Sequence, residues 1–182
     1  MLKPMRTIVL LLLSILLLPI GYSQNLDSTE IENRFQQILP LEQAAYYDSA
    51  AQAYRQLRTQ LRQQKSLDAS HRATYKIGYC LIRAGQRAEA IDSLTTGIGQ
   101  MLQHEDSSYL YIVSAYNELG TASWLLGDIS QAGQYYQKSL TLALKAKPPL
   151  AARIKVARFN IALIRMRQGY YHGLEGIDGL LI

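Results

Sequence analysis

The 182-residue sequence predicts an all-α fold, a solenoid of antiparallel helix hairpins, on three observations. Glycines recur at a fixed interval of 42 residues, at Gly85, Gly127 and Gly169. Small residues keep this interval seven positions earlier, at Gly78, Gly120 and Ala162. Apolar residues between these glycines follow a helical spacing. Self-similarity at a fixed period is typical of repeat arrays, in which each unit stacks on its neighbours to bury its apolar face.

The central unit shows how each hairpin is expected to form. Apolar residues from Tyr109 to Leu126 recur at helical spacing, and Gly127 then ends that helix at a position where a left-handed backbone suits glycine. Asp128 and Gln131 have the spacing of a capping box, which predicts the start of a second helix. Small residues at Gly120 and Ala132 would let the two helices approach closely.

The stretch from Tyr116 to Leu144 resembles a tetratricopeptide repeat. The positions that match the family pattern are Tyr116, Leu119, Gly120, Gly127, Ala132 and Tyr136. Two flanking copies match less completely, at Thr74, Ile77, Gly78, Gly85, Ala90 and Leu94, and at Arg158, Ile161, Ala162, Gly169, Leu174 and Asp178. The interval is longer than the usual repeat by about two helical turns, so longer helices or loops are expected. The resemblance implies a right-handed superhelical solenoid.

The first 23 residues resemble a secretory signal peptide. Lys3 and Arg6 precede an apolar run from Ile8 to Ile20, and Gly21-Tyr22-Ser23 offers a small-x-small cleavage site. An apolar helix of this length reaches only about 20 Å, against about 30 Å for the hydrocarbon core, so an uncleaved membrane anchor is the weaker alternative. The sequence therefore predicts an exported protein, located in the periplasm, with secretion or membrane anchorage as alternatives.

Residues 24–182 are predicted to form one helical repeat domain. It would hold a degenerate first repeat over 27–66, in which Pro40 interrupts the first helix and Ala50 and Tyr54 take the small and aromatic positions. Further repeats are expected over 70–103, 107–146 and 150–182, with Gly97 and Gly99 weakening the end of the second hairpin. The last hairpin, with a turn at Gly169, looks incomplete. It would either self-associate through its uncapped surface or belong to a truncated reading frame, and truncation is favoured.

Composition argues against several functions. Without Lys3 and Arg6 the chain carries 17 basic and 14 acidic residues, an excess too small and dispersed to predict nucleic-acid or membrane binding. The single cysteine, Cys80, permits no intramolecular disulfide and is expected to be a buried, inert thiol. A solvated helix face explains the basic residues of one helix better than a phosphate site does; these are Arg55, Arg58, Arg62 and Lys65.

No pattern predicts catalysis. The histidines His71, His104 and His172 have no metal-ligand spacing, and no phosphate-binding, dinucleotide-binding or nucleophile motif is present. We therefore expect no enzyme activity, no catalytic residues, no metal, no cofactor and no small-molecule substrate.

The family resemblance implies a protein-binding scaffold instead. In the family, first helices of successive repeats line a concave groove that accepts an extended peptide or a partner helix. The matching positions here are Arg72, Tyr75, Tyr79, Arg83, Asn117, Thr121 and Trp124, followed by Phe159, Leu163 and Met166. Chaperone-binding relatives carry Lys and Asn where Tyr75 and Tyr79 stand, so that specificity is not expected. The alternative function is the N-terminal sensory repeat region of a longer membrane signalling protein, a histidine kinase or transcriptional regulator.

Overall fold

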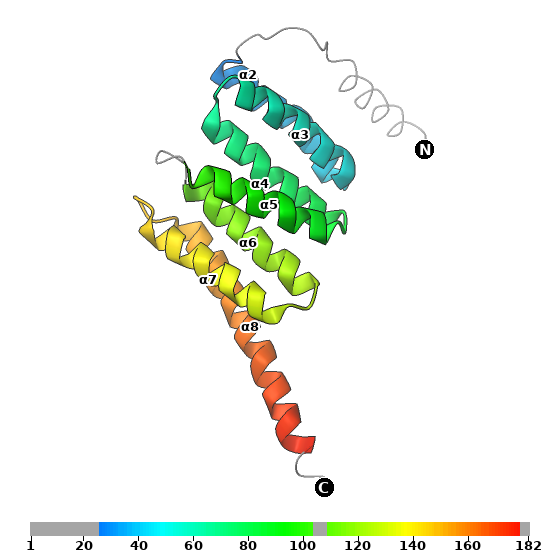
Figure 1. Ribbon diagram of the computed structural model, residues 1–182, viewed down its shortest axis with the longest axis vertical. Coiled ribbons are helices and arrows are strands. Elements are labelled where there is room, and N and C mark those ends of the chain that lie inside the picture. The colour runs from blue at the N-terminus through cyan, green and yellow to red at the C-terminus, as the bar shows by residue number, and fades with distance from the viewer. Residues whose placement is uncertain (1–25, 104–108, 179–182) are drawn as a thin grey trace.

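The structure, a computed structural model, describes residues 26–103 and 109–178, and within them the chain forms helices and no strands (Figure 1). The helices are α2 (Ser28–Gln43), α3 (Tyr47–Gln63), α4 (Leu67–Arg83), α5 (Arg87–Met101), α6 (Tyr109–Leu125), α7 (Ile129–Lys145) and α8 (Ala151–Asp178). The predicted all-α repeat solenoid is confirmed. The expected signal peptide lies outside the described residues.

Neighbouring helices pack in chain order along the stack (Figure 1). In addition α4 contacts α6, and α6 contacts α8, so alternate helices form a layer. Polar contacts between repeats link each layer: Arg72 and Glu32 join α4 to α2, whereas Arg55 and Glu89 join α3 to α5. One layer therefore holds α2, α4, α6 and α8, and the other holds α3, α5 and α7. None of the described helices combines the length and apolar character that a membrane span requires.

Glycines permit the close approach of paired helices, as the sequence predicts. A Cβ on Gly120 would lie 2.5 Å from the Tyr136 ring, and a Cβ on Gly78 would lie 2.3 Å from the Leu94 side chain. A third glycine corrects an expectation. Gly97 does not end the helix, and α5 continues to Met101. A Cβ on Gly97 would lie 2.2 Å from Thr74 Cγ2, so the absence of a side chain lets α5 pack closely against α4.

The turns and caps of the hairpins follow the predicted pattern. Gly85 and Gly127 have φ values of +84° and +87°, which L-residues rarely adopt. The carboxylate of Asp128 accepts a hydrogen bond of 2.9 Å from the backbone N–H of Gln131. Asp27 caps α2 in the same way, with the Glu30 N–H as donor at 2.8 Å. Local sequence therefore sets where these helices begin and end.

Ala45 occupies the same kind of turn without being glycine, with φ of 61°. We expect Ala45→Gly to raise the free energy of unfolding by about 0.5–1 kcal/mol. The reason is that the strain of an alanine in the left-handed region costs more free energy than the extra chain entropy that a glycine loses on folding. Urea denaturation of the purified protein measures the change. Gly85→Ala is the matched reverse substitution and should destabilise by a similar amount, since open space surrounds Gly85 and only its φ opposes a side chain. Destabilisation by Ala45→Gly would contradict the assigned backbone.

Two expectations about helix ends are wrong. Pro40 does not interrupt α2, because Phe35, Ile38 and Leu41 bury one face across it and the proline removes only one backbone hydrogen bond. Ala50 and Tyr54, on α3, are both buried. At the other end α8 runs through Gly169 without the expected turn. Residues 179–182 lie outside the described residues.

α8 continues without a turn because the side of it that corresponds to the α7-facing side of α6 offers little apolar surface for another helix to pack on. On α6, Tyr116 and Gly120 face α7, with the Tyr116 ring 6.3 Å from that of Tyr135. The positions 42 residues later on α8 are Arg158 and Ala162, and both are exposed. One charged and one small side chain offer little apolar area for another helix to bury. The buried side of α8 instead consists of Ala157 and Ile164, which pack toward α7.

Candidate functional site

All seven predicted partner-binding residues lie on α4 and α6, which contact one another. We call the surface that these residues form with the exposed apolar residues of α8 the α4–α6–α8 face. Its members are Arg72, Tyr75, Tyr79, Arg83, Asn117, Thr121, Trp124, Phe159, Leu163 and Met166.

On α4, the structure brings two tyrosines and an arginine together. The ring centroids of Tyr75 and Tyr79 are 6.2 Å apart. The Arg83 guanidinium carbon lies 3.3 Å from the centroid of the Tyr79 ring, a cation–π contact. Burial raises the pKa of Tyr75 to about 12, so its phenol stays protonated at neutral pH. This cluster presents flat aromatic surface beside a cation, a combination that is common at protein interfaces.

Arg72 has a different role from the other predicted residues on α4. Its guanidinium donates to a carboxylate oxygen of Glu32 at 2.6 Å and lies 3.9 Å from the centroid of the Phe35 ring. The hydrogen bond from Arg72 holds the pKa of Glu32 below its ordinary value. Arg72 therefore ties α4 to α2, and its donors are largely used within the protein.

On α6, the predicted residues contact both neighbouring helices. The amide of Asn160 on α8 donates to the Asn117 side-chain oxygen at 2.9 Å. The Thr121 hydroxyl lies 3.4 Å from that of Tyr136 on α7. Trp124 packs against a small cluster with Ile164, and the Arg167 guanidinium lies 4.8 Å from its ring centroid. Asn117 and Trp124 thus contact α8 and Thr121 contacts α7, while all three remain half-buried.

Sequence reasoning missed Glu118, which joins α6 to α4. It is only 7% exposed, and a carboxylate oxygen lies 3.5 Å from the Arg83 guanidinium. Burial raises its pKa above the ordinary value, and the nearby Arg83 charge opposes that shift only in part. A signal was present in the sequence, because Glu118 is the one charged residue of the segment Tyr109–Leu125. A lone charge in such an apolar helix indicates a specific partner.

The α8 residues at equivalent positions differ in being strongly exposed. Phe159, Leu163 and Met166 follow Asn117, Thr121 and Trp124 at the 42-residue interval. Their exposed fractions are 64%, 37% and 71%. With Val156, which is 40% exposed, they form one apolar stripe at helical spacing. Adjacent apolar residues of this kind mark interaction sites when they gather on one side of an element.

In residues 26–103 and 109–178, no cluster of three histidine, cysteine or acidic side chains could hold a metal ion. Cys80 is fully buried, as predicted, and burial raises its pKa to about 12, which keeps the thiol protonated. The face described above instead offers aromatic, amide and apolar groups.

Comparisons with known proteins agree with this architecture. The tetratricopeptide repeat model matches residues 113–145, which lie within the α6–α7 hairpin. A structure entitled a T3SS complex from Aeromonas hydrophila shares 18% identity over 79% of this chain and 85% of that one, with a TM-score of 0.59. The TPR2AB-domain:pHSP90-complex of yeast Sti1 shares 18% identity over 85% of this chain, with a TM-score of 0.57. This chain spans 58% of that longer one. The search of curated proteins gave no match.

These comparisons support the resemblance to tetratricopeptide repeats and place its clearest copy in the central hairpin. At this level of identity the two solved structures show the shared fold alone. The expected positions Gly120, Ala132 and Tyr136 all lie within the matched segment. Ala132 and Tyr136 are buried in the α6–α7 contact.

Proposed function

We propose that this protein is a non-enzymatic interaction scaffold that binds a peptide or a partner helix on the α4–α6–α8 face. One observation carries the proposal: matching positions of α4, α6 and α8 form a row of half-buried side chains that ends in exposed Phe159, Leu163 and Met166. Apolar side chains that no described residue covers gain free energy when a partner removes them from water. The tetratricopeptide match supports a role in protein interaction in general.

The charge of α8 suggests the chemistry of the partner. Between Ala151 and Gln168 the helix carries five basic residues and no acidic one. Arg83 adds a cation on α4 beside the Tyr79 ring. Charge complementarity favours a segment that combines apolar side chains at helical or extended spacing with flanking Asp or Glu. Such a segment would place its apolar residues on the α8 stripe and its carboxylates near the basic groups.

The proposal predicts that peptides bound by the protein depend on Tyr79 and Trp124. Peptides enriched on the immobilised wild-type protein from a displayed random library should bind Tyr79→Ala and Trp124→Ala about tenfold or more weakly, because truncation of aromatic interface residues commonly removes over 1 kcal/mol. Fluorescence anisotropy with the enriched peptides measures the dissociation constants. Circular dichroism confirms that each variant remains helical.

Tyr46→Ala is the matched control, since Tyr46 is a tyrosine that is 44% exposed in the α2–α3 turn, outside α4, α6 and α8. It should leave affinity unchanged. Equal binding of all three variants, or a library that yields no binder, would contradict the proposal.

The cellular setting remains a prediction from sequence. Export, with the periplasm as the expected compartment, depends on residues 1–23 alone. The alternative function as a sensory repeat region of a longer signalling protein would use the same face for its ligand.

A further inference from the structure

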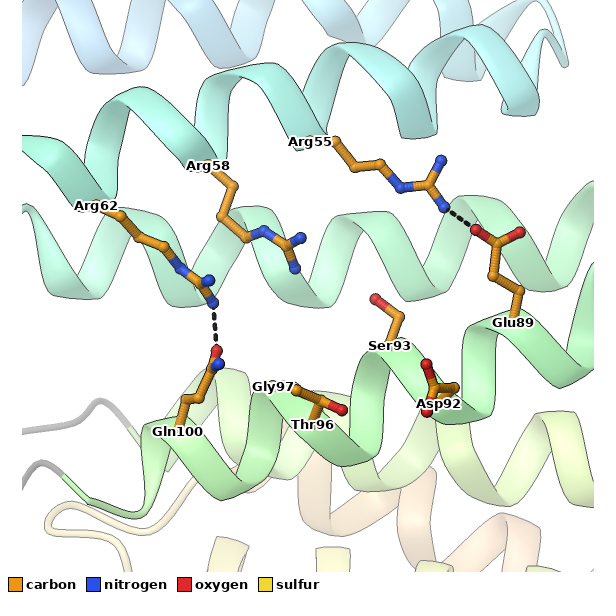
Figure 2. A pocket seen from close by; sticks show the side chains of 9 residues that line it. All are labelled: Arg55, Arg58, Arg62, Glu89, Asp92, Ser93, Thr96, Gly97 and Gln100. Carbon is orange, nitrogen blue, oxygen red and sulfur yellow. Dashed lines mark hydrogen bonds and ion pairs between the residues drawn. The ribbon is translucent and has the colours of Figure 1, made fainter.

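A hollow of about 240 Å³ opens between α3 and α5, in the layer that does not contain the α4–α6–α8 face (Figure 2). Three arginines from one side of α3 point toward it: Arg55, Arg58 and Arg62. Their spacing of three and four residues places them on one helix face. The opposite wall comes from α5, through Glu89, Asp92, Ser93, Thr96, Gly97 and Gln100.

The outer two arginines each contact a side chain of α5, whereas the central one, Arg58, points into the space between these two contacts. Arg55 pairs with Glu89, and Arg62 donates to the Gln100 side-chain oxygen, as the dashed lines in Figure 2 show. Arg58 lies between them, half-buried, with its guanidinium directed into the hollow. No hydrogen bond or ion pair joins Arg58 to any residue in the part of the chain that the structure describes.

The positive charge of Arg58 is not neutralised by a direct partner among the described residues, although Glu89 pairs with Arg55 and Asp92 also lines the hollow. Burial, and then the positive charges of Arg62 and Arg55, lower the pKa of Arg58. The face is therefore not simply a solvated stripe, as the sequence suggests, because half-burial forces the three cations together beside α5. An anion in the hollow would offset this repulsion and accept the free donors of Arg58.

We propose that this hollow binds a phosphate-type oxyanion, with Arg58 as the principal ligand. A guanidinium presents planar paired donors that match the oxygens of a phosphate group. The Ser93 side chain faces Arg58 across the hollow and adds a hydroxyl donor from α5 (Figure 2). A tetrahedral oxyanion can accept from both helices at once, whereas the two oxygens of a carboxylate lie in one plane. Free phosphate and a phosphate monoester on another molecule present the same group, and the experiment below distinguishes them.

The test compares thermal unfolding of the purified protein in inorganic phosphate and in chloride at matched ionic strength. Phosphate should raise the melting temperature of the wild type, because a ligand that binds only the folded state stabilises it by mass action. Arg58→Gln should lose this rise, with phosphate affinity in calorimetry weakened about tenfold or more. In chloride the same variant should unfold at or above the wild-type temperature, since the repulsion among the arginines is relieved.

Arg165→Gln is the matched control, because it removes one exposed arginine from α8 and should keep the full phosphate response. A parallel titration with a short phosphoserine peptide separates the two sources. Tighter binding of the peptide indicates a monoester ligand, and equal or weaker binding indicates free phosphate. The proposal is overturned if phosphate and chloride stabilise the wild type equally, or if Arg58→Gln retains the phosphate response.

Discussion

Gly120→Val is expected to lower the free energy of unfolding by about 3 kcal/mol, because it overpacks the tightest contact of the central hairpin. A Cβ at this position would lie 2.5 Å and 2.6 Å from two carbons of the Tyr136 ring. That ring is only 5% exposed and packs against Ala132 and Ile164, so it cannot swing away without opening the contact with α8. The gain in helix propensity on replacing glycine, about 1 kcal/mol or less, is too small to offset this.

Urea denaturation followed by circular dichroism measures the effect of Gly120→Val. Gly99→Ala provides the matched control, because Gly99 lies inside α5 with no atom within 4 Å of a would-be Cβ. This control should stabilise the protein by about 0.5–1 kcal/mol through helix propensity alone. If Gly120→Val proved as stable as the wild type, α6 and α7 would have to be farther apart than the structure places them.

Local patterns predicted the hairpins because they describe contacts between residues close in sequence. The glycines of the turns and the small residues at Gly78 and Gly120 each report a backbone requirement that only a few residue types satisfy. The errors occur where tertiary packing overrides a local signal. Pro40 and Gly97 are poor helix residues, yet both lie inside helices whose buried faces hold them there.

The polar contacts of the candidate site were less predictable. Arg72–Glu32, Arg83–Glu118 and Asn160–Asn117 each join residues of different repeats. The repeat interval indicates that two helices are neighbours, but not which long side chains meet across them, since rotation and offset between helices are set by the whole packing. The same limit applies to Arg58, whose half-burial depends on how closely α5 approaches α3.

The double substitution Phe159→Ser with Met166→Ser is expected to weaken binding of library-selected peptides by about 100-fold, if each side chain contributes about 1.4 kcal/mol as an interface anchor. These residues are 64% and 71% exposed, so their replacement should change the free energy of unfolding by no more than about 0.5 kcal/mol. Fluorescence anisotropy gives the affinity, and urea denaturation gives the stability. A loss of affinity without a loss of stability would assign the α8 stripe to partner binding.

Leu126→Ser with Leu144→Ser is the control pair, because it removes two leucines that are 55% and 49% exposed and lie outside α4, α6 and α8. It should leave peptide affinity intact.

Sedimentation of the wild type and of both double variants tests whether a second copy of the chain, rather than a peptide, covers the α8 stripe. Because the five basic residues between Ala151 and Gln168 would face five more across a contact between two α8 helices, we expect the wild type to be monomeric. A wild-type dimer that Phe159→Ser with Met166→Ser separates would assign the stripe to self-association, and the peptide-binding role of α8 would then be wrong.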